Sequence, residues 1–355
     1  MTSSTRPKLV LVTGSGRSGT SSVAGTLKRL GLHVPQPEVP ADEANPRGYY
    51  EPLWVTEFHK DVLNPVPVRT IDTRPDAADI AIEAGSAPEV EERLRGWLGE
   101  QLDPALHEGQ ILVKDPRAFW ILPVWTEVAA GLGADVVTLT MLRHPTEVVR
   151  SRDTAYLTEQ TPKFRRQRET ANVAAWVNAA HLTELATREQ ARAFVRYPDL
   201  IEDWRTAMTR AGEQLELTYS ADLADRGHHE VDDFIDAKLN RSAISWDDLS
   251  VPAALRDLAE RTWQAMNVLV EAPHDERAIA ELGALREQYA EMFEHAEAMA
   301  MDATTARVTA GRREVRRNKE AELAEVRREL ETLRAENAAL RRSLPNRLVA
   351  KLRGR

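Results

Sequence analysis

A short apolar strand, a glycine-rich turn and a helix follow one another near the start of the chain, and this combination constrains the fold most. Residues 8–13, KLVLVT, are the apolar, β-branched type of run that forms buried parallel strands. The turn covers residues 14–19, and the helical pattern of residues 20–30 ends at Gly31. Glycines let the backbone turn tightly with its N–H groups pointing inward, and a helix N-terminus adds a favourable dipole. The segment therefore predicts an anion-binding site, with a purely structural turn as the alternative.

Three further short apolar runs predict strands that alternate with helices. They lie at residues 111–113, 136–142 and 193–197. Such alternation indicates an α/β fold with a mostly parallel sheet. In these sheets ligands bind at the carboxyl ends of the strands. Three of the four predicted strands end in charged or glycine-rich turns, so we expect the site at that edge.

Charge is unevenly distributed along the chain, and this excludes one class of protein. The net charge is −9, but residues 312–355 hold 14 basic and 7 acidic residues, which leaves −16 on the rest. An acidic body does not coat nucleic acid, so we expect no nucleic-acid partner. Any anionic ligand must be held by clustered arginines, lysines and backbone N–H groups.

Cysteine is absent from the chain, which excludes disulfides, thiolate metal sites and a cysteine nucleophile. No apolar run approaches the roughly 18 residues that a transmembrane helix needs. The apolar run near the N-terminus is too short for a secretion signal. We therefore expect a soluble, cytoplasmic protein.

The last part of the chain carries a heptad repeat. Past about residue 250 only helical patterns occur, and from about residue 312 the chain is strongly charged. The a positions are Leu323, Leu330, Asn337 and Leu344, and the d positions are Val326, Leu333 and Leu340. The g positions hold Glu322, Glu329 and Glu336, and the e positions hold Arg327, Arg334 and Arg341. This pattern is typical of a coiled coil.

The flanking charges of the repeat predict a parallel homodimer. In a parallel two-stranded coil, each g residue faces the e residue five positions later on the partner, which pairs every one of these glutamates with an arginine. Asn337 at an a position also favours two strands in register. A single solvated helix with charge pairs inside the chain is the alternative. Pro345 is predicted to end the helix, and the basic tail after it predicts either a disordered segment or contact with an anionic membrane surface.

The glycine-rich turn nearly matches the phosphate-binding loop of nucleotide triphosphatases, GxxxxGK[ST]. Gly14, Gly19 and Ser21 fit the pattern, but Thr20 stands where the lysine belongs. A triphosphatase needs that lysine and a magnesium ion to offset the charge of its phosphates. Here the turn carries Arg17 instead, and one guanidinium suits a single phosphate or a phosphosulfate.

Residues 17–21, Arg-Ser-Gly-Thr-Ser, resemble the 5′-phosphosulfate loop of the sulfotransferases that use 3′-phosphoadenosine 5′-phosphosulfate (PAPS). That family also carries an arginine and a serine eight residues apart, at a strand end and in the next helix. Arg143 and Ser151 have this spacing and context. Residues 113–117 and 195–201 resemble two more segments of the family. The resemblance is to the bacterial carbohydrate and glycolipid branch, and it implies a P-loop-NTPase-like three-layer fold.

The resemblance assigns most of the site to binding the donor, PAPS, and its product 3′-phosphoadenosine 5′-phosphate (PAP). The 5′-phosphate would be held by Gly16, Arg17, Ser18, Gly19, Thr20 and Ser21. Arg17 would also offset charge on the leaving group. Arg143 and Ser151 would hold the 3′-phosphate, since a guanidinium and a hydroxyl together suit a dianion. Sulfuryl transfer moves a singly charged group, so the resemblance implies no metal and accounts for the missing loop lysine.

Catalysis needs positive charge over the sulfuryl group and a general base for the acceptor hydroxyl. Lys114 and Arg117, at the end of the second predicted strand, are candidates for the charge, with Asp115 as an orienting or structural partner. Many cytosolic sulfotransferases carry a histidine base two residues after that lysine. Pro116 stands at this position, so the chain departs from them.

Other branches of the family use a glutamate about twenty residues after the loop, and Glu38 matches that spacing. Glu51 is the second candidate for the base because it ends the ordered segment Asn-Pro-Arg-Gly-Tyr-Tyr-Glu. Asp115 and His59 remain as alternatives. The Arg-Lys-Gly loop that grips the 3′-phosphate in cytosolic members is not recognisable, and Arg241 is a candidate for its role.

These features together predict a PAPS-dependent sulfotransferase that acts on a hydroxyl of a small molecule or glycan, a carbohydrate or glycolipid being one candidate. The expected organisation is a catalytic domain over residues 1–275, a helical connector over 276–311, the coiled coil over 312–344 and a basic tail over 345–355. Two alternatives stay open. One is a small-molecule kinase of the P-loop type, and the other is a non-catalytic nucleotide-binding scaffold built around the coiled coil.

Overall fold

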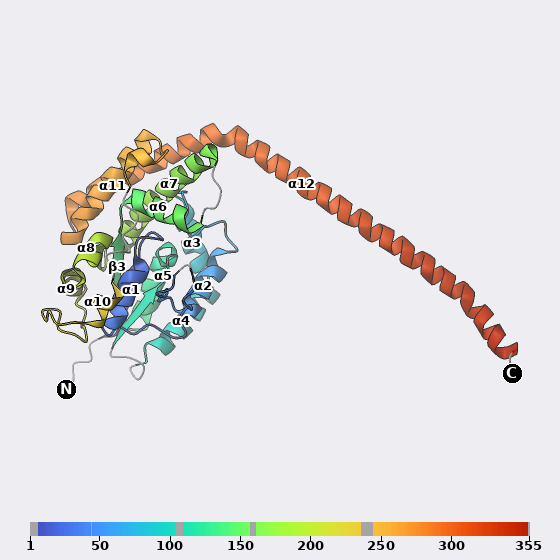
Figure 1. Ribbon diagram of the computed structural model, residues 1–355, viewed down its shortest axis with the longest axis horizontal. Coiled ribbons are helices and arrows are strands. Elements are labelled where there is room, and N and C mark those ends of the chain that lie inside the picture. Colours follow the sequence, from blue (N-terminus) through green and yellow to red (C-terminus); the bar gives the residue numbers. More distant parts are fainter. Residues whose placement is uncertain (1–5, 44, 104–108, 157–160, 236–243, 354–355) are drawn as a thin grey trace. The chain divides into compact units, whose positions relative to one another are not determined.

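Four parallel strands form the central sheet of the protein (Figure 1). Their bounds are Lys8–Thr13 for β1, Gln110–Lys114 for β2, Asp135–Leu142 for β3 and Ala191–Arg196 for β4. The spatial order is β2-β1-β3-β4, so β1 lies between two strands that come later in the chain. Each neighbouring pair is parallel, which confirms the predicted α/β sheet.

The computed structural model describes residues 6–43, 45–103, 109–156, 161–235 and 244–353. The chain divides into two units, Met1–Glu291, which contains the sheet, and Met292–Arg355, which is helical.

Alternate side chains of the strands face two different apolar cores. Leu9 and Leu11 of β1 face the first core, and Val10 and Val12 face the second. The first core is covered by α2 (Leu53–Leu63), α3 (Ala77–Gly85), α4 (Pro88–Gln101), the short helix η1 (Ala118–Ile121) and α5 (Leu122–Gly131). The second is covered by α1 (Thr20–Arg29), α8 (Tyr197–Glu202), α9 (Trp204–Leu215) and α10 (Glu230–Phe234). Helices cover both faces of the sheet, as predicted for a three-layer fold.

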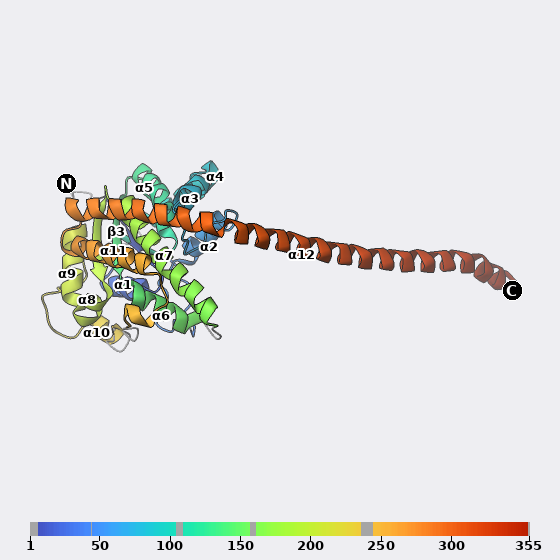
Figure 2. The same ribbon diagram turned by 90° about the horizontal axis from the view of Figure 1, so that it is seen from above.

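Four more helices lie in the described part of the first unit. They are α6 (Pro145–Tyr156), α7 (Pro162–Thr187), α11 (Ala253–Glu271) and the beginning of α12 (Glu276–Arg353). A single turn of 3-10 helix, η3 (Trp246–Asp248), precedes α11. Helix α11 packs against α7 and β4, and Figure 2 shows it beside the first turns of α12. Met266 and Leu269 of α11 share an apolar core with Leu282 of α12.

Helix α12 runs without interruption from Glu276 to Arg353. The prediction that Pro345 ends this helix is therefore wrong. A proline inside a helix removes one N–H donor and strains the preceding turn, but the flanking turns keep their own hydrogen bonds. None of the helices in the described part of the chain has an apolar stretch that could cross a bilayer.

A buried histidine joins α7 to α11. His181 is 2% exposed, and its Nε2 lies 3.0 Å from Oγ1 of Thr262. Burial, helped by the positive charge of Arg286, lowers the pKa of His181 from 6.5 to about 3. The unfolded chain therefore binds a proton at His181 at a pH where the folded chain does not, so folding loses stability as the pH falls below 6.5.

We expect the variant His181→Gln to remove this part of the pH dependence. Between pH 7 and pH 5 the free energy of unfolding of the wild type should fall by about 2 kcal/mol more than that of the variant. Urea denaturation of both proteins at the two pH values measures the difference. An equal fall in both proteins would show that His181 stays accessible to protons in the folded state.

Candidate active site

The turn after β1 holds its shape through two glycines and one residue in an unusual conformation. Gly14, Arg17 and Gly19 have φ angles of 134°, 75° and 98°, a region that favours glycine. A Cβ atom on Gly19 would lie 2.2 Å from Cδ2 of Tyr197. One on Gly14 would lie 2.8 Å from the carbonyl oxygen of Met141. Glycine is therefore required at both positions by conformation and by space.

The N-terminus of α1 opens directly from this turn. Gly19 is the N-cap residue, and no side chain caps the helix there. Because the first N–H groups of a helix have no partner inside it, those of Thr20 and Ser21 are available to a ligand. The helix dipole favours a negative charge at the same place. The predicted anion site thus has the backbone geometry that an anion needs.

A cavity of about 370 Å³ lies where the carboxyl ends of the four strands meet. Residues that follow each strand line it: Gly16, Arg17, Gly19, Thr20, Ser21 and Ser22 after β1, Lys114 and Pro116 at β2, Arg143 and Ser151 after β3, and Tyr197 after β4. Residues 45–49, Glu51 and Phe234 complete the lining. All of the predicted donor-binding residues lie in this lining except Ser18, whose side chain is fully buried.

The two halves of the predicted donor site meet in space. Nε of Arg17 donates a hydrogen bond of 3.1 Å to Oγ of Ser151, which is 134 residues away in the chain. Nη1 of Arg143 donates to the carbonyl oxygen of Arg17 over 3.3 Å. Arg143 at the strand end and Ser151 in the following helix therefore both lie beside the turn.

Arg143 lies inside the protein and not on its surface. It is 5% exposed, its Nε donates to Glu147 over 2.9 Å, and its guanidinium lies 4.4 Å from the ring centre of Tyr197. Burial raises the pKa of the Tyr197 hydroxyl, and the opposing effects of Arg143 and Ser22 are smaller. The phenol is therefore neutral at physiological pH and supports the arginine with its ring face.

Arg152, for which the sequence predicts no role in the site, also contacts the turn. It is 3% exposed, and its Nη2 donates to Oγ of Ser15 and to the carbonyl oxygen of Gly16, each over 3.2 Å. Its Nη1 donates to Asn172 of α7 over 3.3 Å. Its place next to Ser151 is the only sequence signal, and that signal does not tell a buried arginine from a solvated one.

Lys114 and Glu51 form a buried ion pair in the lining of the cavity. Nζ of Lys114 also lies 3.4 Å from Oγ of Ser21, at the start of α1. The second carboxylate oxygen of Glu51 accepts a hydrogen bond of 3.4 Å from Thr56. A carboxylate and an ammonium group are thereby fixed next to the helix N-terminus.

Glu38 has different surroundings from those of Glu51. Its carboxylate pairs with Lys28 and accepts a hydrogen bond of 2.6 Å from Nε2 of Gln36. Its backbone forms an isolated bridge with Pro52, but its side chain is not among those that line the cavity. Glu38 therefore has the predicted distance in sequence from the turn, but its carboxylate binds Lys28 and Gln36 outside the lining of the cavity.

Asp115 and His59 are both fully buried, and neither lines the cavity. Asp115 accepts hydrogen bonds from the backbone and the guanidinium of Arg117, at 2.6–2.9 Å. Nδ1 of His59 lies 3.3 Å from Asp115, and Nε2 of His59 accepts from Trp125. Burial raises the pKa of Asp115, but His59 and Arg117 together hold it well below its ordinary range. Asp115 is thus a fixed anion that orients Arg117.

Arg241, the candidate for a further contact to the 3′-phosphate, lies outside the described residues.

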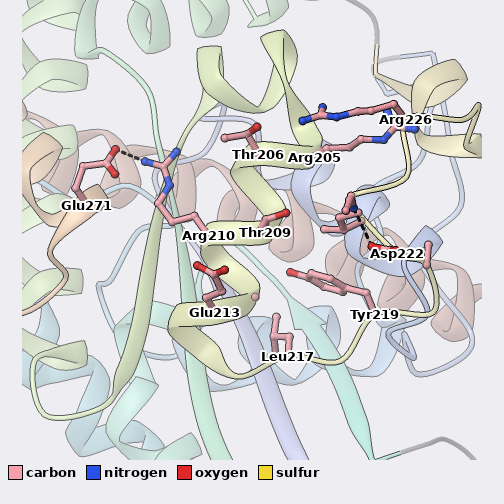
Figure 3. Close-up of a pocket in the computed structure, with 14 residues that line it drawn as sticks. Arg205, Thr206, Thr209, Arg210, Glu213, Leu217, Tyr219, Asp222, Arg226 and Glu271 are labelled. Carbon is pink, nitrogen blue, oxygen red and sulfur yellow. Dashed lines mark hydrogen bonds and ion pairs between the residues drawn. The ribbon is translucent and has the colours of Figure 1, made fainter.

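A larger cavity of about 900 Å³ lies along α9 and the segment after it (Figure 3). The first residues of β1 and β2, Lys8 and Gln110, bond to Leu215 and Thr218 in this region, which places it at the amino ends of the strands. Its arginines are paired with carboxylates: Arg205 with Asp232, Arg210 with Glu271, and Arg226 with Asp203. The charge of this cavity is neutralised, and we assign it no chemistry.

We expect Gly19→Ala to destabilise the protein, because the new methyl group would overlap the ring of Tyr197. The free energy of unfolding should fall by about 1–3 kcal/mol, the usual cost of overpacking. The control is Gly283→Ala in α12, where a Cβ meets no atom within 4 Å. That change should be neutral or stabilising by up to about 1 kcal/mol. Urea denaturation compares the two, and equal stability of both variants would contradict the close packing of Tyr197 on the turn.

Comparisons with known proteins find similar chains only among solved structures. No protein-family model and no curated protein matches the chain. The sulfotransferase domain of the olefin synthase of Synechococcus PCC 7002 is 14% identical, with a TM-score of 0.42 over 75% of this chain and 96% of that domain. The sulfotransferase domain of the curacin biosynthetic pathway is 15% identical, with a TM-score of 0.38 over 74% and 99%. A sulfotransferase of Mycobacterium tuberculosis is 16% identical, with a TM-score of 0.39 over 73% and 77%. All three of these structures are of sulfotransferases or of sulfotransferase domains.

Proposed function

We propose that the protein is a sulfotransferase that moves the sulfuryl group of PAPS to an acceptor hydroxyl. One observation carries the proposal: Arg17 in the turn contacts Ser151 and, through its carbonyl oxygen, Arg143. The two elements that are predicted to bind anions come from distant parts of the chain and contact each other at one cavity. A nucleotide with a phosphate at each end of its ribose fits such a pair of sites.

The donor would lie across the two elements. The N–H groups of Thr20 and Ser21, with Arg17, suit the 5′-phosphosulfate, because several donors converge there at a helix N-terminus. Arg143 and Ser151 suit the 3′-phosphate, because a guanidinium and a hydroxyl provide charge-assisted hydrogen bonds to a dianion. Thr20 occupies the place of the triphosphatase lysine, which agrees with a ligand that has a single phosphate at this position.

The proposed reaction is an in-line displacement at sulfur. The acceptor oxygen forms a bond to sulfur while the bond between sulfur and the phosphate oxygen of the donor breaks, and PAP leaves. The hydroxyl proton passes to a carboxylate. Arg17 and Lys114 offset the negative charge that develops on the leaving phosphate and on the sulfuryl oxygens.

We assign the general base to Glu51 in preference to Glu38. Glu51 lines the cavity beside Lys114 and the start of α1, where the sulfuryl group would lie. The carboxylate of Glu38 is held by Lys28 and Gln36 outside that lining. A base must come within hydrogen-bond reach of the proton that it removes, and Glu51 meets this condition better.

The surroundings of Asp115 disfavour the kinase alternative. A P-loop kinase needs a carboxylate to help hold a magnesium ion at the phosphates. Asp115 follows the correct strand, but Arg117 and His59 occupy its oxygens. A transfer that needs no metal at this position fits these contacts.

We expect PAP to bind the protein in a magnesium-free buffer and to raise its melting temperature, as a ligand of the folded state does. In Arg143→Ala the affinity for PAP should fall about 10- to 100-fold, the range of a lost hydrogen bond between charged groups. Isothermal titration measures the affinity of each protein for PAP, and thermal denaturation measures the melting temperature. The control is Arg277→Ala, which changes an exposed arginine of α12. Stabilisation by ATP with magnesium, and none by PAP, would instead support a kinase.

We expect Glu51→Gln to lower sulfuryl transfer by at least about 100-fold, the contribution of a positioned general base. The affinity for PAP should stay within about threefold, which shows that the cavity remains folded. Transfer of label from PAPS to acceptors in a cell extract measures the rate. Glu38→Gln is the matched control and should keep most of the activity. The opposite ranking of the two variants would move the base to Glu38.

A further inference from the structure

The described residues of the second unit belong to α12, and this helix carries an apolar stripe on an open surface. From residue 294 to residue 340, nearly every residue of the helix is exposed. Leu323, Leu330 and Leu333 are 55%, 45% and 61% exposed, although leucine is usually buried. An amphipathic helix normally buries such a face against another element.

The stripe has the spacing of a coiled-coil seam. Between residues 323 and 344 its positions recur at alternating steps of three and four residues. Met301, Val308 and Val315 are exposed as well, and they extend the stripe toward the N-terminus at steps of seven. Two successive steps of four residues join these stretches. This spacing is that of a four-residue insertion in the heptad repeat, which unwinds a coiled coil locally without ending it. The apolar spacing therefore continues N-terminal to the three regular heptads, with Lys319 at the position that joins the two stretches.

The charges beside the seam discriminate between possible arrangements. A parallel pair places each g position against an e position of the partner, so that Glu322 meets Arg327, and the next two heptads repeat this pairing. An antiparallel pair places g against g and e against e, which would set glutamate against glutamate and arginine against arginine. Asn337 at an a position favours two strands over three.

We propose that α12 pairs in parallel and in register with α12 of a second copy of this chain. A second copy is the occupant that these charges fit, because g and e positions of one sequence are complementary to each other. The pairing needs no ligand and does not depend on the proposed function.

The parallel direction has a consequence for the first unit. Each first unit is joined to the N-terminal end of its own coil, so both copies lie at the same end of the pair. Two binding cavities are then tethered together. If the cavity acts as proposed above, an acceptor with repeated hydroxyl groups meets the second cavity at a raised effective concentration.

Sedimentation of the full chain at micromolar concentration tests the pairing. The expected mass is that of two chains. The mass of one chain, or of three, would overturn the proposal.

Cross-linking tests the direction, and the absence of native cysteine makes it specific. In the full chain, Leu323→Cys at an a position should form a disulfide between two copies under oxidising conditions. Val326→Cys at the next d position gives a second measurement if the first change weakens the seam. Ala324→Cys, which faces away from the seam, is the matched control and should remain a single chain on a non-reducing gel. A dimer in which neither seam cysteine cross-links would be antiparallel or joined elsewhere, and the proposal would fail.

Charge reversal tests the role of the g and e positions. One full-length variant carries Glu322→Arg, Glu329→Arg and Glu336→Arg, and the other carries Arg327→Glu, Arg334→Glu and Arg341→Glu. Each variant alone should dissociate at least tenfold more readily than the wild type, because like charges then face each other. An equal mixture should recover the mass of a pair. Unchanged pairing of each variant alone would show that these charges do not join the chains.

Discussion

The ring of Tyr197 fills the space beside Gly19, and the arrangement of the site depends on this contact. The ring leaves no room for a side chain at Gly19, and its face supports the guanidinium of Arg143 at 4.4 Å. Arg143 in turn donates to the carbonyl oxygen of Arg17. The ends of β3 and β4 and the turn after β1 are thus packed into one piece. A ligand that enters finds its cations already placed, so little of the binding free energy is lost to rearrangement.

The protein is acidic overall, and three cations in or next to the site have a carboxylate neighbour. These pairs are Arg143 with Glu147, Lys114 with Glu51, and Arg117 with Asp115. Pairing lowers the cost of burying a charge, since an isolated buried charge is very unfavourable. It also means that an anion must compete with a carboxylate for these three cations. A ligand with several negative charges competes better than one with a single charge, which is a source of selectivity that does not require base recognition.

The parts of the site that could be predicted from the sequence depend on short spacings. The turn follows from its glycines, and Arg143 and Ser151 follow from their spacing of eight residues between a strand end and the next helix. The roles of Arg152 and Tyr197 depend on contacts between segments that are more than a hundred residues apart, and their neighbours in the sequence carry no trace of them. The surroundings of Glu38 and Glu51 could not be predicted for the same reason, because spacing does not reveal that Lys28 pairs with the first and Lys114 with the second. The heptads predicted the helix, but they did not predict its continuation past Pro345.

The positive φ angle of Arg17 has a consequence for anyone who would move this turn to another protein. A residue with a Cβ atom in that region carries strain, and it stays there only because its surroundings leave no better conformation. Those surroundings come from elsewhere in the chain, namely the Arg152 contacts to Ser15 and Gly16 and the Arg143 contact to Arg17 itself. A graft of residues 14–21 alone would relax to an ordinary loop. The smallest portable version of this turn therefore includes the two arginines that brace it.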